Sequence, residues 1–196
     1  FYFFILLVMG IAAWEWSSLA GISNTVYRAF YVTALLAAMV VSTHNASPIN
    51  LFFSMAIVCW FIALLFICLY PAAQDFWSKK MALIIAGLPL FVPGWLAFFV
   101  LRNQSNHEFH ILLLFFLVAA ADIGAYFAGR TFGKYKLAVR VSPNKTWEGF
   151  VGGVLACTLL LVITALIFSE QLPEMDLMRW FKLVIMGLVI AAFSVV

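Results

Sequence analysis

The residues of this sequence whose types and spacing best suit chemistry stand in one stretch, ADIGAYFAGRTFGKYKLAVRVSPNKTWEGFVGG, from Ala121 to Gly153. Its central part carries four cations with no acidic residue between them: Arg130, Lys134, Lys136 and Arg140. Such a cluster concentrates positive potential and favours a polyanion, so we predict that the first three bind substrate. Basic residues beside a membrane span also follow from topology alone and can contact anionic headgroups, so this alternative stays open.

The glycines in this stretch do not form a phosphate-binding P-loop. In GRTFGKYK, three residues separate Gly129 from Gly133, and Lys134 is followed by Tyr135. A P-loop needs four residues between its glycines, then Lys and Ser or Thr, between a strand and a helix. The basic cluster therefore favours a polyanion through its charge alone.

Asp122 lies within the last two turns of an otherwise apolar segment. An ionised carboxylate there costs several kcal/mol unless it is paired, hydrated or bound to a cation. We therefore predict that Asp122 is a functional, catalytic carboxylate that faces a polar cavity. Hydration at the membrane interface, or pairing with Arg130, is the alternative.

The segment SPNKTWEG predicts the start of a helix at Ser142. Ser is a favoured N-cap, and Pro143 at the first helical position gives up an amide that has no partner. The free amides around Asn144 and Lys145 would then form an anion seat at the positive end of the helix dipole. We accordingly predict substrate binding by Ser142 and Asn144.

Three further polar residues of this segment are not explained by capping. Lys145 adds a full charge and Thr146 a hydroxyl group. Glu148 lies on the same helical face as Lys145 and could hold its amine or approach a metal ion. We predict catalytic roles for Lys145 and Glu148, and substrate binding by Thr146. A motif that only caps and docks one helix is the alternative.

Small residues flank the polar stretch on both sides and predict close helix packing. The preceding helix carries Gly124 and Gly129 among several alanines, and the following one carries Gly149, Gly152 and Gly153. Small side chains allow helix backbones to approach each other closely in membranes. We therefore expect each of these helices to pack tightly against a neighbour.

The composition identifies an integral membrane protein, since 66% of the residues are hydrophobic and only 10% are charged. A helix needs about 20 mostly apolar residues to cross a bilayer. We predict an all-α, polytopic membrane protein, a single domain over residues 1–196, with about seven spans. These are Phe1–Ala13, Val26–Val41, Leu51–Tyr70, Met81–Leu101, Phe109–Ala128, Gly149–Phe168 and Leu183–Val196. Both ends fall within apolar runs, so we expect a fragment truncated at both ends.

The net charge of +3 is distributed unevenly over the predicted loops. The first, third and fifth loops hold most of the Lys and Arg residues, which predicts that these loops are cytoplasmic. The predicted topology depends most on Val26–Val41, because this is the shortest complete candidate span. If it did not cross the membrane, Arg28 and the basic loop would lie on opposite sides.

The remaining candidates are weaker. The three cysteines lie in apolar runs without metal-ligand spacing, and we interpret them as core thiols. His107 and His110 stand three residues apart on the predicted outer side, where we favour interfacial hydrogen bonding over metal binding. Small helix faces make a homodimer plausible, but intramolecular packing explains them equally well.

The stretch from Ala121 to Gly153 resembles the bacterial CTP:phosphatidate cytidylyltransferases, also called CDP-diacylglycerol synthases. That family shows A-D-x-G-A-Y-x-x-G-[RK]-x-F-G-K-x-K-L and then V-S-P-x-K-T-W-[EQ]-G-F-x-G-G. Both patterns are present, from Ala121 to Leu137 and from Val141 to Gly153. A weaker similarity is AAWEWSSLAG, from Ala12 to Gly21.

The resemblance implies a multi-pass enzyme of the bacterial inner membrane, in phospholipid biosynthesis, whose active site faces the cytosol. Its partners would be CTP, phosphatidate and membrane lipids, with Mg²⁺ as cofactor and no nucleic acid. Lys134 and Lys145 would neutralise phosphate oxygens, and Ser142 and Thr146 would orient them. Asp122, as a candidate metal ligand, or Glu148 would hold the metal or position a lysine.

One departure from the family pattern is large. The family's K-R, K-D, P-G-H-G-G and D-R-x-D series, which supplies acidic metal ligands, does not occur in these 196 residues. We therefore expect the main metal ligands to lie in a C-terminal region outside this sequence, and the fragment alone to be inactive.

Two other functions compete with this one. CTP-dependent polyprenol and phytol kinases are also multi-span proteins, and they would transfer a terminal phosphate to an alcohol. A transporter or lipid-binding scaffold is the non-enzymatic alternative. A transporter would more naturally show an internal repeat or several polar residues along the membrane midplane, and this sequence shows neither.

Overall fold

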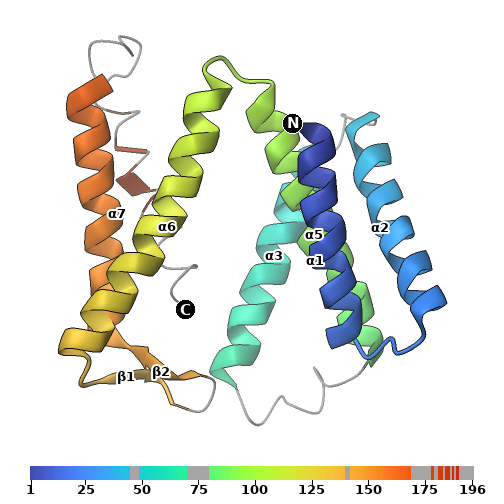
Figure 1. Cartoon of the computed structure of the whole chain (residues 1–196), viewed down its shortest axis with the longest axis horizontal. Coiled ribbons are helices and arrows are strands. Elements are labelled where there is room, and N and C mark those ends of the chain that lie inside the picture. Colours follow the sequence, from blue (N-terminus) through green and yellow to red (C-terminus); the bar gives the residue numbers. More distant parts are fainter. Residues whose placement is uncertain are drawn as a thin grey trace. The chain divides into compact units, whose positions relative to one another are not determined.

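The computed structural model describes residues 1–44, 49–69, 80–139 and 142–168, and positions 178, 181, 182, 184, 185, 187 and 189. Helices dominate these residues, and the predicted all-α membrane architecture is confirmed at this level (Figure 1). Among the described helices, five are long and apolar enough to cross a membrane. They are α1 (Tyr2–Leu19), α2 (Thr25–His44), α5 (Lys80–Arg102), α6 (His107–Phe132) and α7 (Trp147–Phe168).

The predicted count of about seven spans is not confirmed. Helix α3 (Ile49–Cys68) contains a shorter apolar helix, Asn50–Phe66. The predicted span Leu183–Val196 lies mostly outside the described residues. Helix α2 runs three residues beyond the predicted Val26–Val41 and qualifies as a span, so the weakest step of the predicted topology is supported.

The chain divides into two compact units, Phe1–His107 and Glu108–Val196. The first unit is a helical bundle in which α5 packs against α1, α2 and α3. Its core is formed by apolar residues of three helices: Ile5, Ala13, Leu35, Met39, Phe91, Val92, Trp95 and Leu96. The single-domain assignment stays a prediction.

Arg28 belongs to the first turn of α2. Its guanidinium donates hydrogen bonds to the Trp14 carbonyl (2.7 Å) and the Ser17 hydroxyl (3.1 Å). It also lies over the Trp14 ring, 4.3 Å from the centroid. These two hydrogen bonds and the ring contact tie the start of α2 to the last turns of α1.

Gly87 allows two aromatic side chains to reach the backbone of α5. The Trp16 indole N–H donates to the Leu83 carbonyl at 2.9 Å, and the Tyr31 hydroxyl donates to the Ile84 carbonyl at 2.8 Å. A Cβ at position 87 would stand 3.2 Å from the Trp16 nitrogen and would collide with the Tyr31 hydroxyl. Glycine therefore leaves the space in which α1 and α2 dock polar groups on α5.

Up to residue 168, the described part of the second unit contains α6 and α7, which lie side by side and antiparallel, and a small hairpin that joins them (Figure 1). Strand β1 (Lys136–Ala138) pairs antiparallel with β2 (Ser142–Thr146). The helices share a buried core of Leu113, Leu117, Ala121, Cys157 and Leu161. The Cys157 thiol donates to the Leu117 carbonyl (3.2 Å), in agreement with its predicted role as a core thiol.

Candidate active site

The start of α7 is displaced from the predicted position. Ser142 and Pro143 belong to strand β2, and the helix begins at Trp147. The prediction of an N-cap at Ser142 was therefore wrong, because pairing with β1 holds this segment in an extended conformation. The register places Ala138 opposite Ser142 and Lys136 opposite Thr146.

Thr146 is the residue that caps α7. Its hydroxyl oxygen accepts a hydrogen bond from the Gly149 amide at 3.1 Å, the usual bond from an N-cap side chain to the third helical residue. The side chain is only 5% exposed. A helix end that finds this partner satisfies one of its four unpaired amides, so Thr146 fixes where the strand stops and the helix starts.

A seam of glycines brings α6 and α7 into backbone contact. A Cβ on Gly124 would lie 2.6 Å from the Gly152 carbonyl oxygen and 2.5 Å from the Ala156 Cβ. A Cβ on Gly149 would lie 3.3 Å from the Gly129 Cα. The predicted close packing of these small-residue helices is confirmed, and the seam holds the hairpin at a fixed place.

Thr146 lies among three glycines at the hairpin end of this seam. The Cβ positions of Gly129 and Gly149 are each 3.1 Å from its hydroxyl oxygen, and that of Gly133 is 3.0 Å away. Side chains at these positions would push Thr146 off the helix end. The end of α6, the hairpin and the start of α7 therefore form one tightly packed junction.

Glu148 closes the same junction from α7. Its two carboxylate oxygens lie 3.2 and 3.3 Å from the Tyr135 amide nitrogen, which donates to them. In return, the Trp147 amide donates to the Tyr135 carbonyl at 2.9 Å. The Glu148 carboxylate also interacts with the Lys134 amide and with the positive charge of the Lys134 side chain. Glu148 thereby holds the turn that carries Lys134.

The structure places Asp122 away from Glu148. Asp122 is exposed on α6. Its negative charge interacts with the Cys157 thiol of α7, so it lies at the level of Cys157 along the helix pair. It stands roughly two turns, or about 10 Å, before Gly129, which faces Gly149 beside Glu148. The two carboxylates therefore do not meet at one point of this unit.

Arg130 contacts an aromatic residue of its own helix. Its guanidinium donates to the Tyr126 hydroxyl at 2.9 Å and lies 5.9 Å from the centre of the Tyr126 ring. Both side chains are exposed near the end of α6. This contact gives Arg130 a partner other than Asp122, the one considered from the sequence.

The other predicted substrate-binding residues, and the predicted catalytic residue Lys145, lie in the hairpin or in the turn that leads into it. Lys134, Lys136 and Asn144 are exposed, and Ser142 and Lys145 are partly buried. The structure thus gathers the cations of α6 and the hairpin at one end of the α6–α7 pair. Arg140, the fourth cation of the sequence cluster, lies outside the described residues.

The described residues contain no group of three His, Cys, Asp or Glu side chains that could hold a metal ion by themselves. Magnesium sites, however, commonly use one or two carboxylates, with water and substrate phosphates as the other ligands. Given the distance between Asp122 and Glu148, only one of them could ligate a given ion. The described residues therefore fit a magnesium ion that has one protein carboxylate as a ligand and takes its other ligands from substrate phosphates and water.

Comparison with known proteins identifies the family. The family model described as "Cytidylyltransferase family" matches residues 1–196. The chain belongs to the cytidylyltransferase family. The resemblance inferred from the two motifs is thereby confirmed, and the glycine seam and hairpin are the structural form that these motifs take in this family member.

Several curated relatives are named phosphatidate cytidylyltransferase. The protein from Pseudomonas aeruginosa is 36% identical over 154 residues, which cover 79% of this chain and 57% of the relative. The protein from Haemophilus influenzae is 36% identical over 189 residues, which cover 82% of this chain and 64% of the relative. A Staphylococcus haemolyticus protein is 43% identical over 77 residues, covering 39% and 28%. The matched part of this chain thus spans less than two thirds of each relative.

Sequence reasoning missed the role of Tyr135. This residue contributes its backbone amide and carbonyl to Glu148 and Trp147, and its side chain gives no signal of either contact. The alternation of apolar residues in KLAVRV was the available signal for a strand, since strands place alternate residues on opposite faces. The functional assignments of the site residues remain predictions.

Proposed function

We propose that this protein is part of a phosphatidate cytidylyltransferase, which converts CTP and phosphatidate to CDP-diacylglycerol and pyrophosphate in the bacterial inner membrane. The relatives bear this name, and the chain shares their family. The observation that carries the proposal is the gathering of Arg130, Lys134 and Lys136 with Lys145 at the glycine-braced junction of α6 and α7. A fixed cluster of cations is what a triphosphate requires.

In the proposed reaction, an oxygen of the phosphatidate phosphate attacks the α-phosphorus of CTP. A new P–O bond forms there, the bond to the oxygen bridging the α and β phosphates breaks, and pyrophosphate leaves. Negative charge builds up on the transferred group and on the leaving oxygens. Preorganised cations stabilise such charge without having to reorganise during the reaction.

The roles follow from the positions of the side chains. Lys134 and Lys145 would neutralise phosphate oxygens, with Arg130 and Lys136 extending the positive surface. Mg²⁺, held by the phosphates and by Asp122 as the candidate carboxylate ligand, would neutralise further charge. Glu148 would act through Lys134, whose turn it holds.

Further polar groups of β2 would complete the substrate site. Ser142 and Asn144 would orient phosphate oxygens beside the cations. Thr146 is buried and its hydroxyl accepts the Gly149 amide, so it would act mainly by keeping β2 and α7 in place. By the charge distribution of the loops, this site would face the cytosol.

The test uses protein expressed from the full reading frame, in liposomes with phosphatidate, Mg²⁺ and CTP labelled at either the α or the γ phosphate. We expect α label in the lipid and release of pyrophosphate. Lys145→Ala should lower the rate about 100-fold, the usual order for loss of one charge-stabilising group. Lys182→Ala, an exposed lysine outside the junction, is the matched control and should leave the rate unchanged.

Other outcomes would replace the proposal. Transfer of the γ label to an added polyprenol would establish a lipid kinase. If no label reached any lipid, the enzyme assignment would be abandoned and transport would be measured. If Lys145→Ala and Lys182→Ala had equal rates, Lys145 would have no role at the phosphates.

A further inference from the structure

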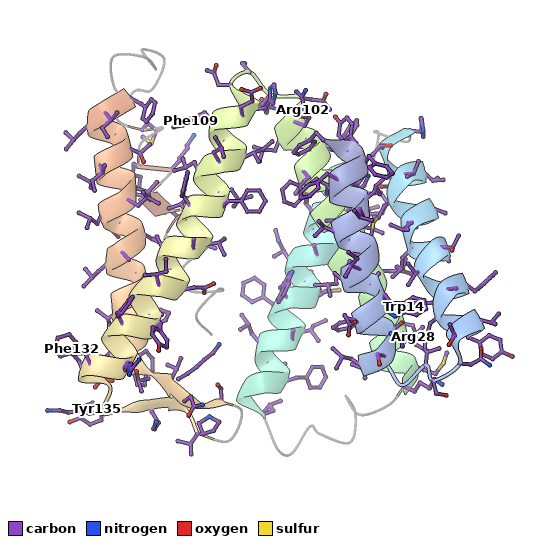
Figure 2. All side chains as sticks on the ribbon, in the orientation of Figure 1. Trp14, Arg28, Arg102, Phe109, Phe132 and Tyr135 are labelled. Atoms are coloured by element: carbon purple, nitrogen blue, oxygen red, sulfur yellow. The ribbon has the colours of Figure 1, made fainter. Side chains whose placement is uncertain are left out.

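The junction between α6 and α7 exposes large apolar side chains that the proposed chemistry does not use. Phe132 is 67% exposed, Tyr135 72%, Val139 64% and Trp147 51%. They belong to the end of α6, the hairpin and the start of α7, and we call them the hairpin's apolar rim. Figure 2 shows the labelled Phe132 and Tyr135 at this end of the unit. Four such residues in one short connection are unusual for a surface in contact with water alone.

Lysine residues lie between and beside the residues of this apolar rim. Lys134 stands between Phe132 and Tyr135 in the sequence, Lys136 follows directly, and both lysines are exposed. No acidic residue occurs from 123 to 147, and Glu148 is directed to the Tyr135 amide. The surface therefore combines aromatic rings with a net positive charge, although the Glu148 carboxylate interacts with the charge of Lys134.

The position of the hairpin along the chain decides which partner this combination fits. α6 ends at Phe132 and α7 begins at Trp147, and both helices are long and apolar enough to cross a membrane. The connection between two such spans lies at the bilayer surface. Aromatic side chains are enriched at that depth, and lysines there attract anionic headgroups.

A neighbouring contact supports the same location. Tyr126, one turn before Arg130, is 57% exposed, and the two side chains are joined by a hydrogen bond and a ring contact. An exposed aromatic residue with a cation at its polar end suits the boundary between hydrocarbon and headgroups. The apolar and cationic surface thus continues from the hairpin onto α6.

We propose that the hairpin is a lipid-docking surface: its apolar rim enters the headgroup region, and Lys134 and Lys136 bind the phosphates of anionic phospholipids. The occupant is the membrane in which the protein is embedded. This lipid binding needs no nucleotide, so it holds whether or not the protein transfers a cytidylyl group. If it does, docking keeps acidic lipid concentrated beside the cation cluster.

The experiment measures the surroundings of an environment-sensitive fluorophore on a single cysteine. Val139→Cys carries it on the apolar rim, in protein from the full reading frame with Cys59, Cys68 and Cys157 replaced by alanine. Gln104→Cys, in the exposed polar turn between α5 and α6, is the control position. Both are placed in vesicles of phosphatidylcholine alone or mixed with phosphatidylglycerol, with quenchers attached to the lipid or dissolved in water.

We expect the fluorophore at position 139 to emit at shorter wavelength in vesicles than in detergent and to be quenched by the lipid-bound quencher. The effect should increase with phosphatidylglycerol, and Lys136→Gln should reduce that increase by about half, whereas Lys182→Gln should not. The fluorophore at position 104 should respond mainly to the aqueous quencher.

Two results would overturn the proposal. Equal quenching from water at positions 139 and 104 would show that the hairpin projects into solvent. An apolar environment in both detergent and vesicles, without quenching from lipid, would show that protein covers the surface. Neither result would bear on cytidylyl transfer, which the labelled-CTP assay decides separately.

Discussion

Thr146 unites two roles that the sequence treats as separate, since it ends a strand and caps a helix. Its hydroxyl accepts the Gly149 amide, and its side chain packs among Gly129, Gly133 and Gly149. Serine can supply the same hydroxyl group, whereas valine keeps the shape and removes it. The pair of substitutions therefore separates the hydrogen bond from the packing.

We expect Thr146→Val to lower the free energy of unfolding by about 1 kcal/mol, the usual cost of losing an N-cap. Thr146→Ser should retain most of that stability. The measurement is the midpoint of thermal unfolding of the purified protein in detergent. Equal midpoints for the serine and valine variants would contradict the capping role.

At the scale of elements, the glycine seam makes a hairpin and two helices behave as one part. Gly152 faces α6 so closely that a Cβ there would lie 2.7 Å from the Gly124 carbonyl oxygen. Gly10 on α1 is different, because its Cβ would lie 3.7 Å from a flexible Leu36 methyl group, an ordinary contact. The same substitution at the two positions should therefore have different effects on stability.

We expect Gly152→Ala to destabilise the protein by about 1–3 kcal/mol, as overpacking does when backbone has to move. Gly10→Ala should be neutral or slightly stabilising, since alanine is the better helix former. Unfolding in a graded series of denaturing detergent would measure both. A stable Gly152→Ala variant would mean that the seam is looser than described.

The elements also show how far the sequence could lead. Apolar runs long enough to span predicted most of the helices, and small residues predicted the seam, because both signals are local. The helix start at Ser142 was wrong because Ser-Pro is equally compatible with a strand, and pairing with β1 decided between them. The contacts of Tyr135 run through its backbone, so no property of its side chain could have indicated them.

At the scale of the whole molecule, the topology depends on α3. Its apolar helix, Asn50–Phe66, is shorter than the five candidate spans. If α2, α3, α5 and α6 all cross the membrane, the turn after α1 and the β hairpin lie on the same side. The turn between α5 and α6 then lies on the other side. If α3 does not cross, the hairpin changes sides relative to the first turn.

We expect the first of these arrangements, with the hairpin on the cytoplasmic side. Single cysteines at Ser23, Gln104 and Asn144 would be treated with a membrane-impermeant thiol reagent in right-side-out and inverted vesicles, after replacement of the native cysteines. Position 104 should react in right-side-out vesicles, and positions 23 and 144 only in inverted ones. Reaction of 23 and 144 from opposite sides would show that α3 does not span.

The backbone contact at Gly124 and Gly152 also has a genetic consequence. Every single-base missense change in a glycine codon introduces a residue with a Cβ, whether alanine, serine, valine or a charged side chain. At these two positions, that first carbon already meets the facing helix. No single-base missense change at either codon is therefore conservative. In a library of random mutants selected for function, we expect these two glycines to be among the positions replaced least often.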